Sequence, residues 1–176
     1  MSISGRLFAS MDNSKTPPIT VGAGDGPTLS IVGDTYRIVA SGKQTGGAYA
    51  AIDMLIPQHG GPGPHAHAHF QESFYVMEGE VEFTSEAGSY TAKQGSFIEI
   101  PLGGVVHCFT NKQEKVAHLL CFVVPAGLDE FFVEIGQPVE PGTFLPPPKL
   151  DPEKLKKLQA IAERYGQQVF PPNYFG

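Results

Sequence analysis

The chain has 176 residues, enough for one domain with a buried core. Its 21 glycines and 16 prolines lie between short apolar runs, a composition typical of many short strands joined by tight turns. A formal net charge of −6 argues against nucleic acid or an anionic membrane as a partner, because both repel an acidic surface. The start of the chain lacks the apolar run of a signal peptide, and the apolar run 119–126 is too short to span a bilayer, so we expect a cytoplasmic protein.

Residues 1–27 are predicted to form an N-terminal arm, since their Thr-Pro-Pro and Gly-Ala-Gly-Asp-Gly stretches offer little to pack. From residue 28 onward, short segments rich in β-branched and aromatic residues follow one another between turn residues such as Gly-Asp and Gly-Gly. Nine short strands with no helix between them predict an all-β fold, a sandwich or barrel of antiparallel sheet over residues 28–125. The predicted strands are 28–32, 35–40, 48–56, 72–78, 81–84, 89–92, 96–100, 106–110 and 116–124.

Residues 126–176 are predicted to form a C-terminal extension with two short helices packed on the barrel. The first helix is expected over 128–135, between two glycines. The second begins at Asp151, a suitable N-cap, with Pro152 in the first helical position, and ends at Gly166. The proline-rich stretch between the helices predicts an extended linker laid over the barrel. We expect this extension to cover the barrel or contact a second subunit, and not to carry catalytic groups.

Three of the six histidines stand in the stretch Pro-His-Ala-His-Ala-His, at positions 65, 67 and 69. On a strand, residues two apart share a face, so two of these imidazoles would point to one place, as a metal ion requires. Spacing alone allows either His65 with His67 or His67 with His69. The alternative is a histidine-rich surface stretch that holds no metal.

Glu72 follows His67 by five residues, so on an unbroken strand its side chain would point to the opposite face. If Glu72 belongs to the same site, the chain must turn or bulge within residues 68–71. Phe74 and Val76 then share the face of Glu72 and are expected to line the barrel interior.

Two motifs in the sequence resemble those of the cupin superfamily. The first reads His65-Ala-His67, four residues, Glu72, six residues and Gly79. The second contains Gly95, Pro101, Gly103, His107 and Asn111, with one residue more than usual between Gly103 and His107. The resemblance covers roughly residues 48–125, and it implies a double-stranded β-helix, also called a jelly-roll barrel.

The resemblance also implies a ligand set: His65, His67, Glu72 and His107 would bind one divalent transition metal, which could be Fe, Mn, Ni, Co, Cu or Zn. His69 falls outside the motif and is expected at the rim of the site. The substrate pocket is expected to be apolar and to be formed by His69, Phe74, Val76, Phe97, Phe109 and Phe122.

Within the cupins, Gly-Gly-Pro-Gly-Pro-His-Ala-His followed by Glu-Ser-Phe-Tyr-Val-Met-Glu-Gly is similar to the single-domain quercetinase-like group. This implies a dioxygenase that cleaves a flavonol-like aromatic enol with O2, with Glu72 as the catalytic residue that takes the enolic proton. The alternatives are another metal-cupin enzyme, such as an isomerase or an oxalate-type enzyme, and a non-catalytic cupin that binds or senses a small molecule. A homodimer is expected, because open barrels with an N-terminal arm commonly pair their edge strands.

Overall fold

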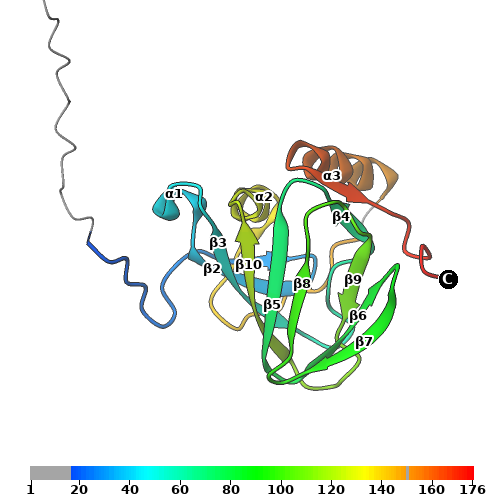
Figure 1. Ribbon diagram of the computed structural model, residues 1–176, viewed down its shortest axis with the longest axis horizontal. Coiled ribbons are helices and arrows are strands. Elements are labelled where there is room, and N and C mark those ends of the chain that lie inside the picture. The colour runs from blue at the N-terminus through cyan, green and yellow to red at the C-terminus, as the bar shows by residue number, and fades with distance from the viewer. Residues whose placement is uncertain (1–16, 150) are drawn as a thin grey trace, which may run out of the picture.

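The computed structural model describes residues 17–149 and 151–176, and within them two antiparallel sheets pack face to face (Figure 1). The larger sheet has the strand order β11 (Gln137–Pro138), β1 (Thr28–Ile31), β2 (Asp34–Ala40), β3 (Ala50–Ile56), β10 (Ala117–Val124), β5 (Gln71–Glu78) and β8 (Phe97–Ile100). The smaller sheet has the order β12 (Gln167–Val169), β4 (His65–His67), β9 (His107–Thr110), β6 (Glu80–Ser85) and β7 (Gly88–Lys93). The predicted all-β jelly-roll barrel is confirmed.

The core lies between the two sheets, because each strand buries alternate side chains there. The ring centroid of Phe74 from the larger sheet lies 5.3 and 5.4 Å from those of Phe83 and Phe109 in the smaller sheet. Burial of these rings removes much apolar surface from water and holds the sheets together.

In the part of the chain that the structure describes, three helices accompany the barrel. The short helix α1 (Gly42–Thr45) follows β2 and begins with a capping box, in which Ser41 and Gln44 each bond the other's backbone N–H. The prediction that no helix interrupts the strands is therefore wrong at this point. The predicted C-terminal helices are present as α2 (Leu128–Ile135) and α3 (Pro152–Arg164), and all three helices lie at the same end of the barrel (Figure 1). No helix in the described ranges is both long and apolar enough to cross a membrane.

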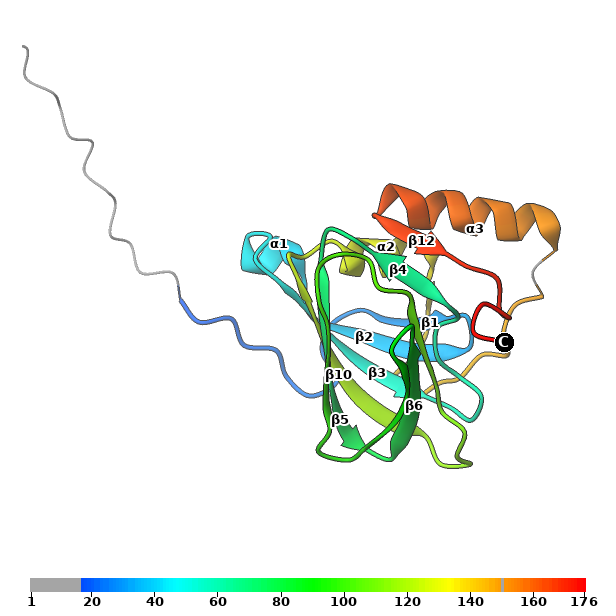
Figure 2. The same cartoon turned by 45° about the vertical axis from the view of Figure 1, so that its right-hand side comes forward.

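Two short strands, β11 and β12, come from the predicted C-terminal extension. β11 pairs with β1 at the edge of the larger sheet, and β12 pairs with β4 at the edge of the smaller sheet (Figure 2). The sequences Gln-Pro and Gln-Gln-Val show no strand periodicity, so sequence analysis did not find them. They become strands because the edges of β1 and β4 offer open backbone hydrogen-bonding groups.

Residues 17–27, the described part of the predicted N-terminal arm, contain no helix or strand. Residues 1–16 of that arm lie outside the described residues. The division into arm, barrel and extension remains a prediction.

Candidate metal centre

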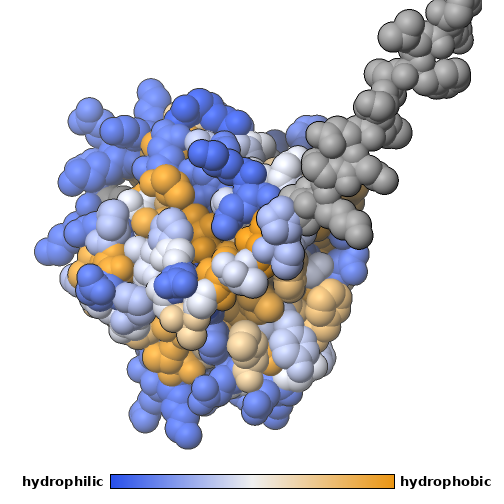
Figure 3. Space-filling view, turned by 90° about the vertical axis from the view of Figure 1, so that its left-hand side faces the viewer, coloured by the Kyte–Doolittle hydropathy of each residue, from blue (hydrophilic) through white to orange (hydrophobic). Residues whose placement is uncertain are grey.

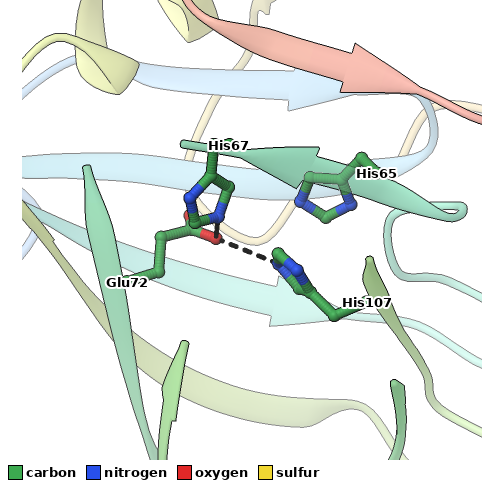
Figure 4. Close-up of side chains that lie close together, drawn as sticks. All are labelled: His65, His67, Glu72 and His107. Carbon is green, nitrogen blue, oxygen red and sulfur yellow. Dashed lines mark hydrogen bonds and ion pairs between the residues drawn. The ribbon is translucent and has the colours of Figure 1, made fainter. Parts of the chain in front are cut away.

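Four side chains from three strands point toward one place between the sheets (Figure 4). His65 and His67 extend from β4, and His107 extends from the neighbouring strand β9, where it is the register partner of His65. Glu72 reaches the same place from β5 in the opposite sheet. One ligand atom from each residue lies within 4.8 Å of all the others. The structure thus brings together the four residues that the motifs singled out.

The chain turns sharply between β4 and β5, as the position of Glu72 requires. β4 ends at His67, residues 68–70 cross from the smaller to the larger sheet, and β5 begins at Gln71. Phe70 fixes this corner, because its carbonyl oxygen lies 2.8 Å from His67 Nδ1 and its ring stacks on the imidazole with centroids 4.1 Å apart. The predicted turn within residues 68–71 is confirmed.

The extra residue before His107 is accommodated by two glycines. Gly103 and Gly104 have φ values of 119° and 80°, a backbone region that glycine adopts without strain. The loop therefore makes room for one more residue before β9 begins. Phe74, Val76 and Phe109 are buried inside the barrel near these strands.

The loop that leads into β4 is held at several points. The backbone of Gly60 accepts a hydrogen bond from the N–H of Asn111, and Gly61 donates its N–H to the buried carboxylate of Asp34. Gly61 has φ 117°, and a Cβ there would lie 2.1 Å from the carbonyl oxygen of Phe109. Only glycine fits this close approach, which sets where β4 starts.

Each imidazole is oriented by a backbone carbonyl. The Nδ1 atoms of His65, His67 and His107 lie 2.9, 2.8 and 3.0 Å from the carbonyl oxygens of Gly63, Phe70 and Val105. A carbonyl oxygen can only accept, so each Nδ1 carries a proton and donates it. This leaves the three Nε2 atoms facing the centre of the cluster, which is the arrangement found in metal-binding histidines.

The donor atoms fit a divalent transition metal. His67 Nε2 and His107 Nε2 lie 3.0 and 3.5 Å from Glu72 Oε2, and His107 Nε2 is buried without a hydrogen-bond partner among the described residues. A neutral imidazole protonated on Nδ1 offers a lone pair at Nε2, and a carboxylate also offers lone pairs, so a cation placed between these atoms would hold them together. Two ligands at right angles, each about 2.1 Å from an ion, are about 3.0 Å apart. Nitrogen and oxygen donors of this kind suit several first-row ions.

Burial and mutual contact determine the charges in the cluster. Burial alone would raise the pKa of Glu72, but its contacts with His107 and His67 outweigh this and hold the pKa well below its ordinary value. Burial lowers the pKa of His65 to about 4, so this imidazole is neutral at neutral pH. Burial would also lower the pKa of His67, but the contact with Glu72 raises it overall. A metal ion would replace the proton that His67 takes up beside this carboxylate.

Two of the aromatic residues expected in the substrate pocket face outward, which corrects that prediction. The side chains of Phe97 and Phe122 are 60% and 38% exposed. On β8 the inward residues are Ile98 and Ile100, and Phe97 is instead the register partner of the exposed Tyr75. Exposed apolar side chains on this outer face of β5, β8 and β10 are Tyr75, Met77, Phe97, Phe122 and Val124. Figure 3 shows a face of the molecule where hydrophobic side chains lie open to solvent.

His69 is exposed and does not belong to the cluster. One residue that sequence analysis did not place at the site does reach it: the Cys121 thiol on β10 lies 3.8 Å from Glu72 Oε1. The one sequence signal for this contact was the place of Cys121 in an apolar strand. It stands two residues after Leu119, so the two side chains share the inward face.

Comparison with known proteins agrees with the motifs and the fold. Residues 52–123 match the family model of the cupin domain. This matched segment includes all four residues of the cluster. Quercetin 2,3-dioxygenase from Bacillus subtilis (strain 168) is similar to the chain, with 25% identity over 127 residues. The match covers 72% of this chain and 37% of that protein, so the chain corresponds to little more than a third of its relative.

Two solved structures show the same fold. A predicted oxalate decarboxylase from Thermotoga maritima superimposes with a TM-score of 0.54 at 19% identity, covering 61% of this chain and 99% of that chain. Ectoine synthase from P. lautus superimposes with a TM-score of 0.51 at 20% identity, covering 66% of this chain and 84% of that chain. At this level of identity, the similarity shows the fold alone.

Proposed function

We propose that this protein is a metal-dependent dioxygenase that cleaves a flavonol-like aromatic enol with O2. The observation that carries the proposal is the buried cluster of three Nε2-directed histidines and Glu72 inside an apolar barrel. The similarity to a quercetin 2,3-dioxygenase supports the choice of substrate class.

A divalent ion held by His65, His67, Glu72 and His107 would supply Lewis-acid polarisation of a substrate oxygen. Glu72 remains ionised because its pKa is held low, so its carboxylate can accept the proton of an enolic hydroxyl placed beside it. The rings of Phe70, Phe74 and Phe109 provide buried apolar surface around the cluster, which suits an aromatic substrate and excludes water.

The alternatives are another metal-cupin reaction (that of an isomerase or an oxalate-type enzyme) and non-catalytic binding of a small molecule. A small dianion such as oxalate needs cationic side chains beside the metal. Among the buried side chains of the described residues none is lysine or arginine. This absence of buried cationic side chains favours a neutral aromatic enol. The homodimer and the cytoplasmic location remain predictions from the sequence.

The proposal is tested by oxygen uptake. The metal-free protein is loaded separately with Fe²⁺, Mn²⁺, Co²⁺ or Ni²⁺ and mixed with quercetin in an oxygen electrode. We expect oxygen uptake with at least one ion. His67→Ala under the same conditions should show none above background, and this control also corrects for the uncatalysed oxidation of quercetin. Absence of uptake with every ion would overturn the dioxygenase proposal, and quercetin binding without uptake would favour a binding protein.

A further inference from the structure

The C-terminal strand β12 lies directly beside the strand that carries two of the four metal-ligand candidates. Gln167 is the register partner of His67, and Val169 is the register partner of His65. The N–H of Phe170 extends this pairing by donating to the carbonyl oxygen of Pro64 at 2.9 Å. β4 thus has β9 with His107 on one side and β12 on the other (Figures 2 and 4).

The side chain of Gln167 projects to the same side of the sheet as the imidazole of His67. Directly opposed residues of an antiparallel pair share a face, and their Cβ atoms are about 4.5–5.5 Å apart. Gln167 is 7% exposed, whereas the next residue, Gln168, pairs with Ala66 on the other face and is exposed. Gln167 therefore lies on the inner face, one strand away from the metal-ligand candidates.

The amide of Gln167 has an unused hydrogen-bonding group. Its Nε2 atom is buried and has no hydrogen-bond partner among residues 17–149 and 151–176. A buried amide N–H without a partner is unfavourable, so such a group in a folded protein requires an explanation. Anchoring of β12 does not explain it, because the backbone pairing with β4 and the bond from Phe170 to Pro64 already hold the strand. Val169, the other residue of this strand on the same face, is 43% exposed, so Gln167 is the residue of β12 whose side chain is buried beside β4.

We propose that Gln167 is a ligand-binding residue of the metal centre and that its amide N–H donates to an oxygen atom of the molecule bound there. Four protein ligands leave one or two positions of an octahedral ion for oxygen atoms of an enolate or a similar chelating group. An amide one strand beyond His67 can reach such a group and favour ligands that present an acceptor oxygen. The C-terminal strand then completes the binding site, in contrast to the covering role expected from the sequence.

This inference rests on the metal centre of the proposed function, and its test reads binding instead of turnover. The protein is loaded with Zn²⁺, which has no redox chemistry, and is titrated under argon with quercetin, whose absorption band reports binding. Gln167→Met removes the amide and keeps the length of the side chain. Gln168→Met makes the same change on the exposed face of the same strand and is the matched control.

We expect Gln167→Met to weaken quercetin binding about tenfold, the value of one hydrogen bond, while Gln168→Met binds as the unchanged protein does. Zn²⁺ content, measured by elemental analysis, should be equal in all three proteins. Equal quercetin affinity of the two variants would overturn the proposal.

A second measurement covers the case in which Gln167→Met does not fold or the substrate class is wrong. In the unchanged Zn²⁺ protein labelled with ¹⁵N, the side-chain amide signal of Gln167 should shift on addition of acetohydroxamate, a small chelating oxygen ligand, and that of Gln168 should not. If quercetin fails to bind but this shift occurs, the flavonol assignment is wrong and the role of Gln167 stands. If acetohydroxamate binds without moving the Gln167 signal, the role of Gln167 is refuted.

Discussion

The Cys121 thiol donates to Glu72 Oε1 at 3.8 Å, while the other carboxylate oxygen, Oε2, faces His67 and His107. The two residues meet because β10 and β5 are neighbours and both side chains point inward. Burial, followed by the negative charge of Glu72, raises the pKa of Cys121 well above its ordinary value. Cys121 therefore stays a protonated donor, and it orients the carboxylate with Oε2 toward the imidazoles.

We expect Cys121→Val to weaken metal binding about tenfold or more, because partners that orient metal ligands typically contribute that much. Cys121→Ser retains a donor and should bind more tightly than the valine variant. The dissociation constant for Zn²⁺ is measured by competition with a chelator. Cys108→Ser, a change at the half-buried cysteine on β9, is the control. If Cys121→Val and Cys108→Ser bind Zn²⁺ equally well, Cys121 has no orienting role.

The metal-ligand set predicts different metal contents for two histidine variants. His67→Ala removes one ligand and leaves Glu72 buried beside fewer donors, so purified protein should contain little metal. His69→Ala changes an exposed histidine two residues away and should retain the metal. Elemental analysis of both proteins after the same loading checks this expectation. Equal metal content in the two variants would contradict the assignment of His67.

Asp34 predicts a dependence of stability on pH. Its buried carboxylate accepts hydrogen bonds from Gly61 N–H and Tyr36 Oη–H, and burial nevertheless raises its pKa from 3.8 to about 7. Between these two values the unfolded chain releases the proton and the folded chain keeps it. The contribution of Asp34 to the free energy of unfolding therefore falls as pH rises from about 4 to about 7 and is constant above that, a loss on the order of 4 kcal/mol.

Asp34→Asn removes this titration. As pH rises from about 4 to about 8, the free energy of unfolding of the variant should therefore fall less than that of the unchanged protein. Urea denaturation of both metal-free proteins at several pH values measures the difference. The remaining titrating groups are common to both proteins and cancel in the comparison. Parallel stability curves across this range would show that Asp34 does not titrate as proposed.

Truncation of a buried phenylalanine and of an exposed one should lower the free energy of unfolding by different amounts. Phe109→Ala leaves a cavity beside Phe74 and Phe83 and should lower the free energy of unfolding by about 3–5 kcal/mol. Phe97→Ala removes a side chain that is 60% exposed and should change it by less than about 1 kcal/mol. Urea denaturation at one pH compares the two variants. A large loss for Phe97→Ala in a monomeric preparation would contradict the outward orientation found here.

Local spacing in the sequence indicated that two neighbouring histidines share one face of a strand and that Glu72 can join them only after a turn. The resemblance to the two cupin motifs then singled out the four residues that the structure brings together. The C-terminal helices could also be predicted, because N-cap residues and flanking glycines act within a few residues of the chain.

Only the tertiary structure decided which faces of β8 and β10 are inside. Alternation along a strand has a period of two, so it shows that Phe97 and Ile98 point apart but not which of them is buried. That choice depends on which sheet packs over the strand, a contact between distant segments. The same holds for β12: Gln-Gln-Val has no strand pattern of its own and becomes a strand at the open edge of β4. Long-range pairing thereby placed Gln167 beside His67.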